Sequence, residues 1–329
     1  MGCRATETSK VAQFRLCHLK NFMSKNIRNR ITKKNIGIVI PAYNEENNIE
    51  NCLASIIEQT YPNIEVIVVD NNSTDKTFEM ALKFTDKVFN KGPERSAQRN
   101  YGMKEVATGK YVMHIDADMI LSPSLIRTCV ETINTTNYLA LHIPEVVLGE
   151  KFFSRVRRFE RCFYDGTVID GARFFLKDAF IRVGGFDETM SGPEDWDIDK
   201  RIKKIGAIGL VTRTSNKINQ ADSWPLSNFI KTRGVAPEHH GDVIYHNEAE
   251  FNLQNYLAKK KYYSRGLQEY INKWGANDSD VRKQLGVSYR YFEVFFSKGR
   301  WKQLISHPVL TLGMYFLRIL VGLRFFLKQ

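Results

Sequence analysis

The sequence lacks several features that would place it in a special class of protein. Its five cysteines are scattered along 329 residues and form no C-x-x-C pair. The first 35 residues lack the long apolar core of a secretory signal, and no internal repeat or low-complexity tract follows. We therefore expect a globular protein with free thiols in a reducing compartment. An apolar content of 43% allows it a full hydrophobic core.

Acidic residues are scarce at both ends of the chain. Residues 1–35 carry nine Lys/Arg against one acid, and residues 251–329 carry fourteen against four. The total charge is +12, so the middle of the chain is net acidic. A basic end can bind nucleic acid or an anionic membrane, or it can simply be solvated. Because no nucleic-acid-binding motif accompanies the charge, we expect no nucleic-acid partner.

The C-terminal segment "HPVLTLGMYFLRILVGLRFFLKQ" is apolar but lacks an uninterrupted apolar run. Arg318 and Arg324 interrupt it, and a charge in the middle of a bilayer is costly. Basic side chains beside an aromatic and aliphatic stripe are typical of a helix that lies in the membrane interface. The alternative is a terminal helix that packs on the core of the protein.

Apolar, β-branched segments alternate with segments of helical periodicity between residues 36 and about 135. The pattern predicts strands over 36–41, 64–70, 86–90 and 111–118. It predicts helices over 77–84 and 95–107, a helix that begins after the capping residue Asn44, and a helix that begins after the capping residue Ser122. Such alternation predicts an α/β fold with a mostly parallel sheet covered on both faces. We expect a basic tail over 1–35, an α/β domain over 36–249 and a helical extension over 250–329.

Acidic side chains follow the predicted strands, where ligands of open α/β sheets bind. Asp70 ends the second strand, and Asp116 and Asp118 end the fourth with one residue between them. If that strand continues, both side chains point the same way, and two convergent carboxylates suit Mg²⁺ or Mn²⁺. The alternatives are a turn-forming Asp70 and a solvated loop with two acids.

Five ordered motifs resemble glycosyltransferase family 2. They are "IVIPAYNEENNI", "VIVVDNNSTDKT", "HIDADM", "GGFDE" and "EDWDIDKRI", and the resemblance as a whole spans roughly Ile36 to Glu248. The resemblance implies a GT-A fold and a nucleotide-diphosphate sugar as donor. No Q-x-x-R-W motif of processive members is present, so the resemblance implies transfer of one sugar per event.

The resemblance also implies a donor site with a metal ion. Tyr43, Glu45 and Asp70 would contact the nucleotide, and Arg99, four residues after Arg95, would contact phosphate. Asp116 and Asp118 would be the D-x-D motif, with Asp118 as the more direct ligand of Mg²⁺ or Mn²⁺. His246 would complete the metal or diphosphate site, although a lone histidine is often structural.

The segment "SGPEDWDIDKRIKKIG" predicts a helix whose apolar face contains Ile198, Ile202 and Ile205. Asp195 lies on that side at the helix start, which capping alone would also explain. In the family, this position holds the catalytic base of inverting members, so the resemblance implies that role for Asp195. Glu194 and Trp196 would shape the acceptor site.

We therefore expect a metal-dependent inverting glycosyltransferase at the cytoplasmic face of the membrane, with a glycan or lipid-linked acceptor. One alternative is a sugar nucleotidyltransferase, although "PAYNEENN" stands where its Gly-rich loop would follow the first strand. The other is a non-catalytic nucleotide-binding protein on the membrane surface.

Overall fold

The computed structural model describes residues 35–212, 224–237, 240–296 and 299–326. Residues 35–329 form one compact unit. The predicted basic tail lies almost wholly outside the described residues. No helix in the described part of the chain combines the length and the apolar character that are needed to span a bilayer.

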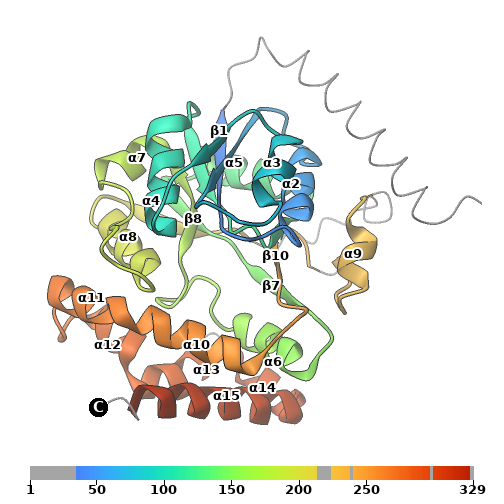
Figure 1. The fold of residues 1–329 in the computed structure, drawn as a ribbon. Helices are drawn as coiled ribbons and strands as arrows, with labels where there is room; N and C mark the ends of the chain where they lie inside the picture. Colours follow the sequence, from blue (N-terminus) through green and yellow to red (C-terminus); the bar gives the residue numbers. More distant parts are fainter. Residues whose placement is uncertain (1–34, 213–223, 238–239, 297–298, 327–329) are drawn as a thin grey trace, which may run out of the picture. The chain divides into compact units, whose positions relative to one another are not determined.

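The centre of the unit is a seven-stranded sheet (Figure 1). Its order is β3 (Val88–Asn90), β2 (Ile64–Asp70), β1 (Ile36–Ala42), β4 (Tyr111–His114), β8 (Ala172–Leu176), β6 (Tyr138–His142) and β9 (Ala207–Leu210). All neighbouring pairs are parallel except the two that β8 makes with β4 and β6. The predicted mostly parallel sheet is therefore confirmed, and the carboxyl ends of β1, β2 and β4 meet at one edge.

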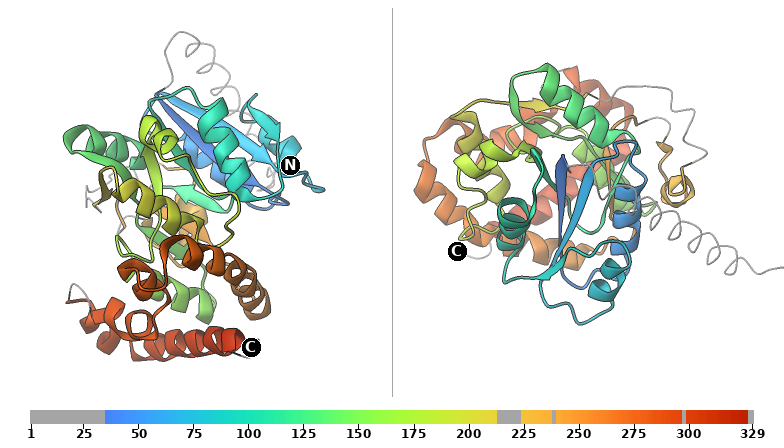
Figure 2. Two further views of the ribbon diagram at one scale, coloured as in Figure 1. Left: turned by 90° about the vertical axis from the view of Figure 1, so that its left-hand side faces the viewer. Right: turned by 90° about the horizontal axis from the view of Figure 1, so that it is seen from above.

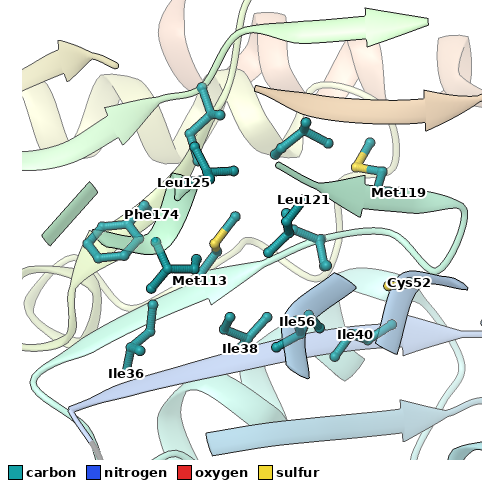
Figure 3. Close-up of a cluster of buried hydrophobic side chains, with 14 of the residues drawn as sticks. Ile36, Ile38, Ile40, Cys52, Ile56, Met113, Met119, Leu121, Leu125 and Phe174 are labelled. Atoms are coloured by element: carbon teal, nitrogen blue, oxygen red, sulfur yellow. The ribbon is translucent and has the colours of Figure 1, made fainter. Parts of the chain in front are cut away.

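Helices cover both faces of the sheet (Figure 2). Ile36, Ile38 and Ile40 of β1 point to one face, against α2 (Ile49–Ile57) and α5 (Leu125–Thr135), as Figure 3 shows for part of this cluster. Val39 points to the other face, which is covered by η2 (Tyr101–Val106), α7 (Lys177–Arg182) and α8 (Glu194–Lys203). Burial on both faces explains why the strand reads as a continuous apolar run.

A second, three-stranded sheet lies beyond the carboxyl end of β4. It has the order β5 (Met119–Leu121), β10 (Ile244–Asn247) and β7 (Glu145–Leu148). β10 pairs antiparallel with β5, and this register places His246 opposite Met119. The sheet thus joins the segment after Asp118 to a strand more than 120 residues further along the chain.

Four of the helices after residue 250 share an apolar cluster with α6 (Phe152–Arg161). In Figure 1, α15 lies on the side of α6 and α10 that faces away from the strands. These four helices are α10 (Leu253–Tyr263), α13 (Val294–Phe296), α14 (Trp301–Ser306) and α15 (Pro308–Phe326). α11 (Leu267–Trp274) and α12 (Ser279–Leu285) pack on one another and on Trp196 of α8. The shared apolar core means that the extension is part of the compact unit. The remaining helices are α3 (Thr77–Leu82), α4 (Arg95–Asn100) and α9 (Ser227–Lys231).

Three of the differences from the predicted element boundaries bear on the site. The fourth strand ends at His114, so Asp116 and Asp118 lie in the turn between β4 and β5. α2 begins at Ile49 rather than after Asn44, because Asn44 has a positive φ of 53°. α5 begins at Leu125, because the Ser122 hydroxyl accepts from the Val243 N–H and is not available as a cap.

Candidate active site

The loops that follow β1 and β2 are held together by their own side chains. Asn44 Oδ1 accepts the Thr74 N–H at 2.8 Å, and Ser73 Oγ accepts the Asn44 N–H at 2.9 Å. Asp70 accepts both the Ser73 N–H at 2.8 Å and the Ser73 hydroxyl at 2.5 Å. Asp70 is 1% exposed and forms the turn, as the alternative interpretation of this residue expected. Its nucleotide contact stays a prediction.

Tyr43 and Glu45 lie on the same edge of the sheet with different exposure. Tyr43 is one of the exposed aromatic side chains, while Glu45 is half-buried and accepts a hydrogen bond from the Asn48 amide at 2.8 Å. Burial, reinforced by the nearby Asp118 carboxylate, raises the pKa of Glu45 to about 7. The charge of Glu45 is therefore coupled to the charges of the two D-x-D carboxylates.

Asp116 is neutralised by protein cations. Arg99 Nη2 donates to Asp116 Oδ1 at 2.8 Å, and Arg173 Nη1 lies 3.8 Å from Asp116 Oδ2. Burial opposes the charged form, yet Arg99 and Arg173 hold the pKa of Asp116 well below its usual range. The repulsion between the two D-x-D carboxylates is thus relieved on this side by guanidinium groups, whereas the sequence suggested a metal ion for both.

Asp118 contacts a different partner, the His246 imidazole. His246 Nε2 lies 3.1 Å from Asp118 Oδ2, and the β10 backbone supports this contact because the Asn247 N–H donates to the Asp118 carbonyl at 2.9 Å. Asp118 Oδ1 is buried and has no hydrogen-bond partner in the described part of the protein. A buried carboxylate oxygen without a partner is costly, which marks it as a ligand position.

Glu145 of β7 fixes the orientation of the imidazole. His246 Nδ1 lies 2.9 Å from Glu145 Oε1, so Nδ1 donates to Glu145 and Nε2 faces Asp118. Although burial opposes protonation, Asp118 and Glu145 raise the pKa of His246 well above its ordinary value. A carboxylate behind a histidine that faces a metal site is a common arrangement.

Asp195 lies in the first turn of α8, where the helix dipole favours a carboxylate. Its Oδ1 is 3.3 Å from Arg99 Nη1, so the Arg99 guanidinium contacts both Asp116 and Asp195. The Asp195 side chain is 30% exposed, and a Cβ placed on Gly171 would lie only 2.7 Å from Asp195 Cβ. Asp195 is therefore packed tightly on one side and open to solvent on another.

The two residues expected on the acceptor side are already engaged within the protein. Glu194 is fully buried and pairs with Arg95 Nη2 at 2.5 Å. Trp196 donates its indole N–H to the Ile169 carbonyl at 3.0 Å and packs on Tyr270 of α11. Glu194 and Trp196 flank Asp195 in the sequence, and their side chains are bonded inside the protein. A direct contact with the acceptor stays a prediction.

The donor atoms around Asp118 suit a divalent cation. Asp118 Oδ1 is an oxygen donor, and His246 Nε2 becomes a nitrogen donor once a binding metal displaces its proton; the nitrogen favours Mn²⁺ over Mg²⁺. Within the described residues, no group of three or more His, Cys, Asp or Glu side chains is arranged to hold a metal ion.

The sequence interpretation missed two charged residues that shape the site. Arg173 lies within the apolar strand β8, and Glu145 begins the apolar strand β7. The Arg173 guanidinium and the Glu145 carboxylate are 3.5 Å apart, which links the Asp116 and His246 sides of the site. A single charge inside an apolar strand was the available signal, because such a residue needs a buried partner.

The family match covers the D-x-D acids but ends before Asp195 and His246. The family model described as "Glycosyl transferase family 2" matches residues 37–186. "Glycosyltransferase GlyA" of Streptococcus pneumoniae serotype 4 is 30% identical over 139 residues, which are 37% of this chain and 20% of that protein. An uncharacterised glycosyltransferase of Rickettsia typhi is 25% identical over 191 residues, which are 53% of this chain and 60% of that protein. The chain thus covers less than two thirds of either relative.

A solved structure has the same fold over nearly the whole chain. It is a mannosyltransferase from Pyrobaculum calidifontis in complex with GDP-Man and Mn²⁺, with a TM-score of 0.53 and 17% identity. The similarity covers 94% of this chain and 92% of that one. The α/β core is thus of the GT-A type. The family match over residues 37–186, the relatives named as glycosyltransferases and this fold together support a glycosyltransferase of the family 2 type.

Proposed function

We propose that the protein transfers one sugar from a nucleotide-diphosphate sugar to an acceptor hydroxyl, with inversion at the anomeric carbon. The observation that carries this proposal is the Arg99 guanidinium, which lies 2.8 Å from Asp116 Oδ1 and 3.3 Å from Asp195 Oδ1. One buried cation thereby joins the donor-side acid to the candidate base. The acceptor is proposed to be a glycan or a lipid-linked molecule.

In this proposal, Asp195 takes the proton of the acceptor hydroxyl as that oxygen attacks the anomeric carbon. The new carbon–oxygen bond forms while the bond from the anomeric carbon to the phosphate oxygen breaks, and its electron pair leaves with the nucleoside diphosphate. A single displacement inverts the configuration. Arg99 holds Asp195 beside Asp116, so the base is positioned before the acceptor binds.

Asp118 and His246 would hold the divalent cation, with Asp118 Oδ1 as its carboxylate ligand. A bound Mn²⁺ or Mg²⁺ would supply charge stabilisation to the departing diphosphate. Asp116 would support the site through Arg99. Such cations are commonly held by one or two carboxylates together with substrate phosphates.

Asp195→Asn tests the base assignment. We expect the turnover rate to fall by about 10³-fold, because an amide cannot take the proton. The affinity for UDP or GDP with Mn²⁺, measured by calorimetry, should stay within about twofold. Asp178→Asn is the matched control, since Asp178 is an exposed acid in the first turn of α7.

Full activity of Asp195→Asn would remove Asp195 as the base. If the substitution abolished nucleotide binding as well as turnover, Asp195 would belong to the donor site instead.

We also propose that α15 docks on an anionic membrane, as a peripheral contact on the cytoplasmic side. Its outward face carries an apolar stripe at spacings of three and four residues, each side chain at least 48% exposed: Val309, Leu312, Phe316, Ile319 and Leu323. The segment 287–329 has seven Lys/Arg against one acid. An apolar stripe within a basic segment is complementary to an anionic lipid surface.

One part of the sequence argument for this helix is wrong. Arg318 is 7% exposed and pairs with Glu160 of α6 at 2.9 Å, so it points into the protein rather than to lipid headgroups. The Arg324 side chain and Lys328 lie outside what the structure describes. The membrane proposal therefore rests on the apolar stripe and on the charge of the segment.

Co-sedimentation with phosphatidylcholine vesicles that contain phosphatidylglycerol tests this docking. The double variant Leu312→Glu/Phe316→Glu should reduce the bound fraction at least about tenfold, because two apolar contacts are replaced by charges. Leu82→Glu, at an equally exposed position on α3, should bind like the wild type. Equal binding of the double variant would refute the proposal, and a wild-type dimer that the double variant makes monomeric would assign the stripe to self-association.

A further inference from the structure

The C-terminal end of α10 packs against the segment that leads into α8. Arg95 Nη1 donates to the Tyr263 hydroxyl at 2.9 Å, and the Arg95 guanidinium lies 4.6 Å from the Tyr263 ring centroid. Arg95 also pairs with Glu194, the residue before Asp195. A Cβ placed on Gly192 would lie 2.3 Å from the Tyr263 carbonyl oxygen. The helical extension therefore forms one wall of the active site.

Lys259 lies one helical turn before Tyr263 and so shares its face of α10. Its Nζ is 5.9 Å from the Tyr263 ring centroid. Its charge interacts with the carboxylates of Asp118, Asp116 and Glu45. Yet within the described residues no carboxylate lies within 4.0 Å of the ammonium group, and the side chain is exposed. Lys259 is thus a cation beside the D-x-D acids that lacks a close anionic partner.

The two neighbouring lysines differ from Lys259. The Lys260 ammonium lies 5.4 Å from the ring centroid of Tyr256 and interacts with Arg157 and Glu160, on the side of α6. Lys261 is exposed on the surface of the helix. Of these three lysines, only Lys259 has a charge interaction with the D-x-D acids among those that the structure shows.

We propose that Lys259 binds the diphosphate of the nucleotide-sugar donor from the side opposite Asp118. This inference rests on the proposed function, because it requires that a diphosphate lies over the D-x-D acids. An ammonium group on a flexible stem is a suitable phosphate ligand, because its side chain can adjust its position to the phosphate oxygens. As the sugar departs, charge grows on the diphosphate, and Lys259 stabilises the leaving group.

Three variants, each tested with nucleotide ligands of different phosphate content, separate this role from a structural one. Lys259→Ala should weaken the binding of UDP or GDP with Mn²⁺ at least tenfold by calorimetry, while the affinity for the nucleoside without phosphate stays within twofold. Lys259→Arg should recover most of the diphosphate affinity. Lys261→Ala, on the exposed side of the same helix, should bind like the wild type.

The outcomes distinguish this inference from the proposed function. If the wild type transfers sugar and Lys259→Ala binds the diphosphate as tightly as the wild type, the Lys259 inference fails and the function stands. If Lys259→Ala lowers nucleoside and diphosphate affinity equally, Lys259 has only a structural role and the inference fails. If the wild type binds neither UDP nor GDP with Mn²⁺, both proposals fail together.

Discussion

Two clusters of charged side chains in this protein differ in how completely the oxygens of their carboxylates are paired. In the cluster between α6 and α15, Glu160 Oε1 pairs with Arg318 at 2.9 Å and Oε2 with Arg157 at 2.8 Å, and both Glu160 and Arg318 are less than one-tenth exposed. In the active-site cluster, Asp118 Oδ1 has no hydrogen-bond partner in the described residues, and Asp195 is 30% exposed. In the first, which we call the closed cluster, both carboxylate oxygens are paired and the role is structural. In the second, the open cluster, a carboxylate oxygen is available to a ligand.

The largest effect is expected from Asp118→Asn, which removes the negative charge of the carboxylate whose Oδ1 has no partner in the described residues. Turnover should fall by about 10³-fold, equivalent to about 4 kcal/mol, because the leaving diphosphate loses its stabilising cation. Calorimetry should show that Mn²⁺ no longer strengthens nucleotide binding. Asp86→Asn changes an exposed acid of the sheet edge and should be neutral. Unchanged Mn²⁺ dependence in Asp118→Asn would move the metal site elsewhere.

Arg99→Lys should lower turnover by about 10²-fold. A lysine keeps the charge but cannot present two nitrogens to Asp116 and Asp195 at once, as the Arg99 guanidinium does. Initial-rate kinetics at saturating donor would show the loss, and Arg182→Lys on exposed α7 is the control. If Arg99→Lys is fully active, the bridge between the two acids has no role in catalysis.

How far the sequence predicted the fold depended on the range of the interaction. The strands β1 and β2 were predicted because buried parallel strands are apolar along their whole length. That Asp116 and Asp118 have different partners was not predicted, because Arg173 and His246 contact them from β8 and β10, far along the chain.

The same limit applies to the terminal helix. A helical pattern with apolar residues on more than one face does not reveal which face meets the protein. Gly313 of α15 packs against Val156 and Phe152 of α6, and Arg318 of the same helix pairs with Glu160 of α6. Features that are set by neighbouring residues in the sequence were therefore predicted. The pairing of buried charges from distant segments of the chain was not.

Glu160→Gln tests the closed cluster and should affect stability rather than catalysis. Arg318 and Arg157 overcome the effect of burial and lower the pKa of Glu160 to about 2. We expect a loss of about 2 kcal/mol in the free energy of unfolding at pH 7, because both arginines lose a charged partner. Denaturant unfolding would measure it, with exposed Glu131→Gln as the control.

The pH dependence of this variant has a defined sign. Because the folded state holds Glu160 ionised, its contribution is present above the unfolded pKa of roughly 4.5 and is lost as the pH falls towards about 2. The difference between wild type and Glu160→Gln should therefore narrow as the pH falls below 4.5. A constant difference across this range would show that the cluster stabilises by packing rather than by charge.

The smallest effect is expected from Lys260→Met at the edge of the closed cluster. Burial, helped by Arg157, lowers the pKa of Lys260 to about 7. Below pH 7 the folded protein must carry this unfavourable charge, so the variant should be more stable by about 1 kcal/mol at pH 6. Because only the unfolded wild type stays protonated between pH 7 and 10.5, wild-type stability rises there and the advantage disappears.

Thermal unfolding at several pH values would measure this effect, with Lys261→Met as the control on the exposed side of α10. A variant that is less stable than the wild type at pH 6 would show that Lys260 contributes a favourable contact to the cluster.

The most direct test of the open cluster is the position of manganese in a crystal grown with Mn²⁺ and UDP or GDP, located by its anomalous scattering. The account predicts a peak at Asp118 and His246, in a pocket that Asp195 also borders. A manganese ion bound elsewhere, with Asp118 still paired only to His246, would contradict it.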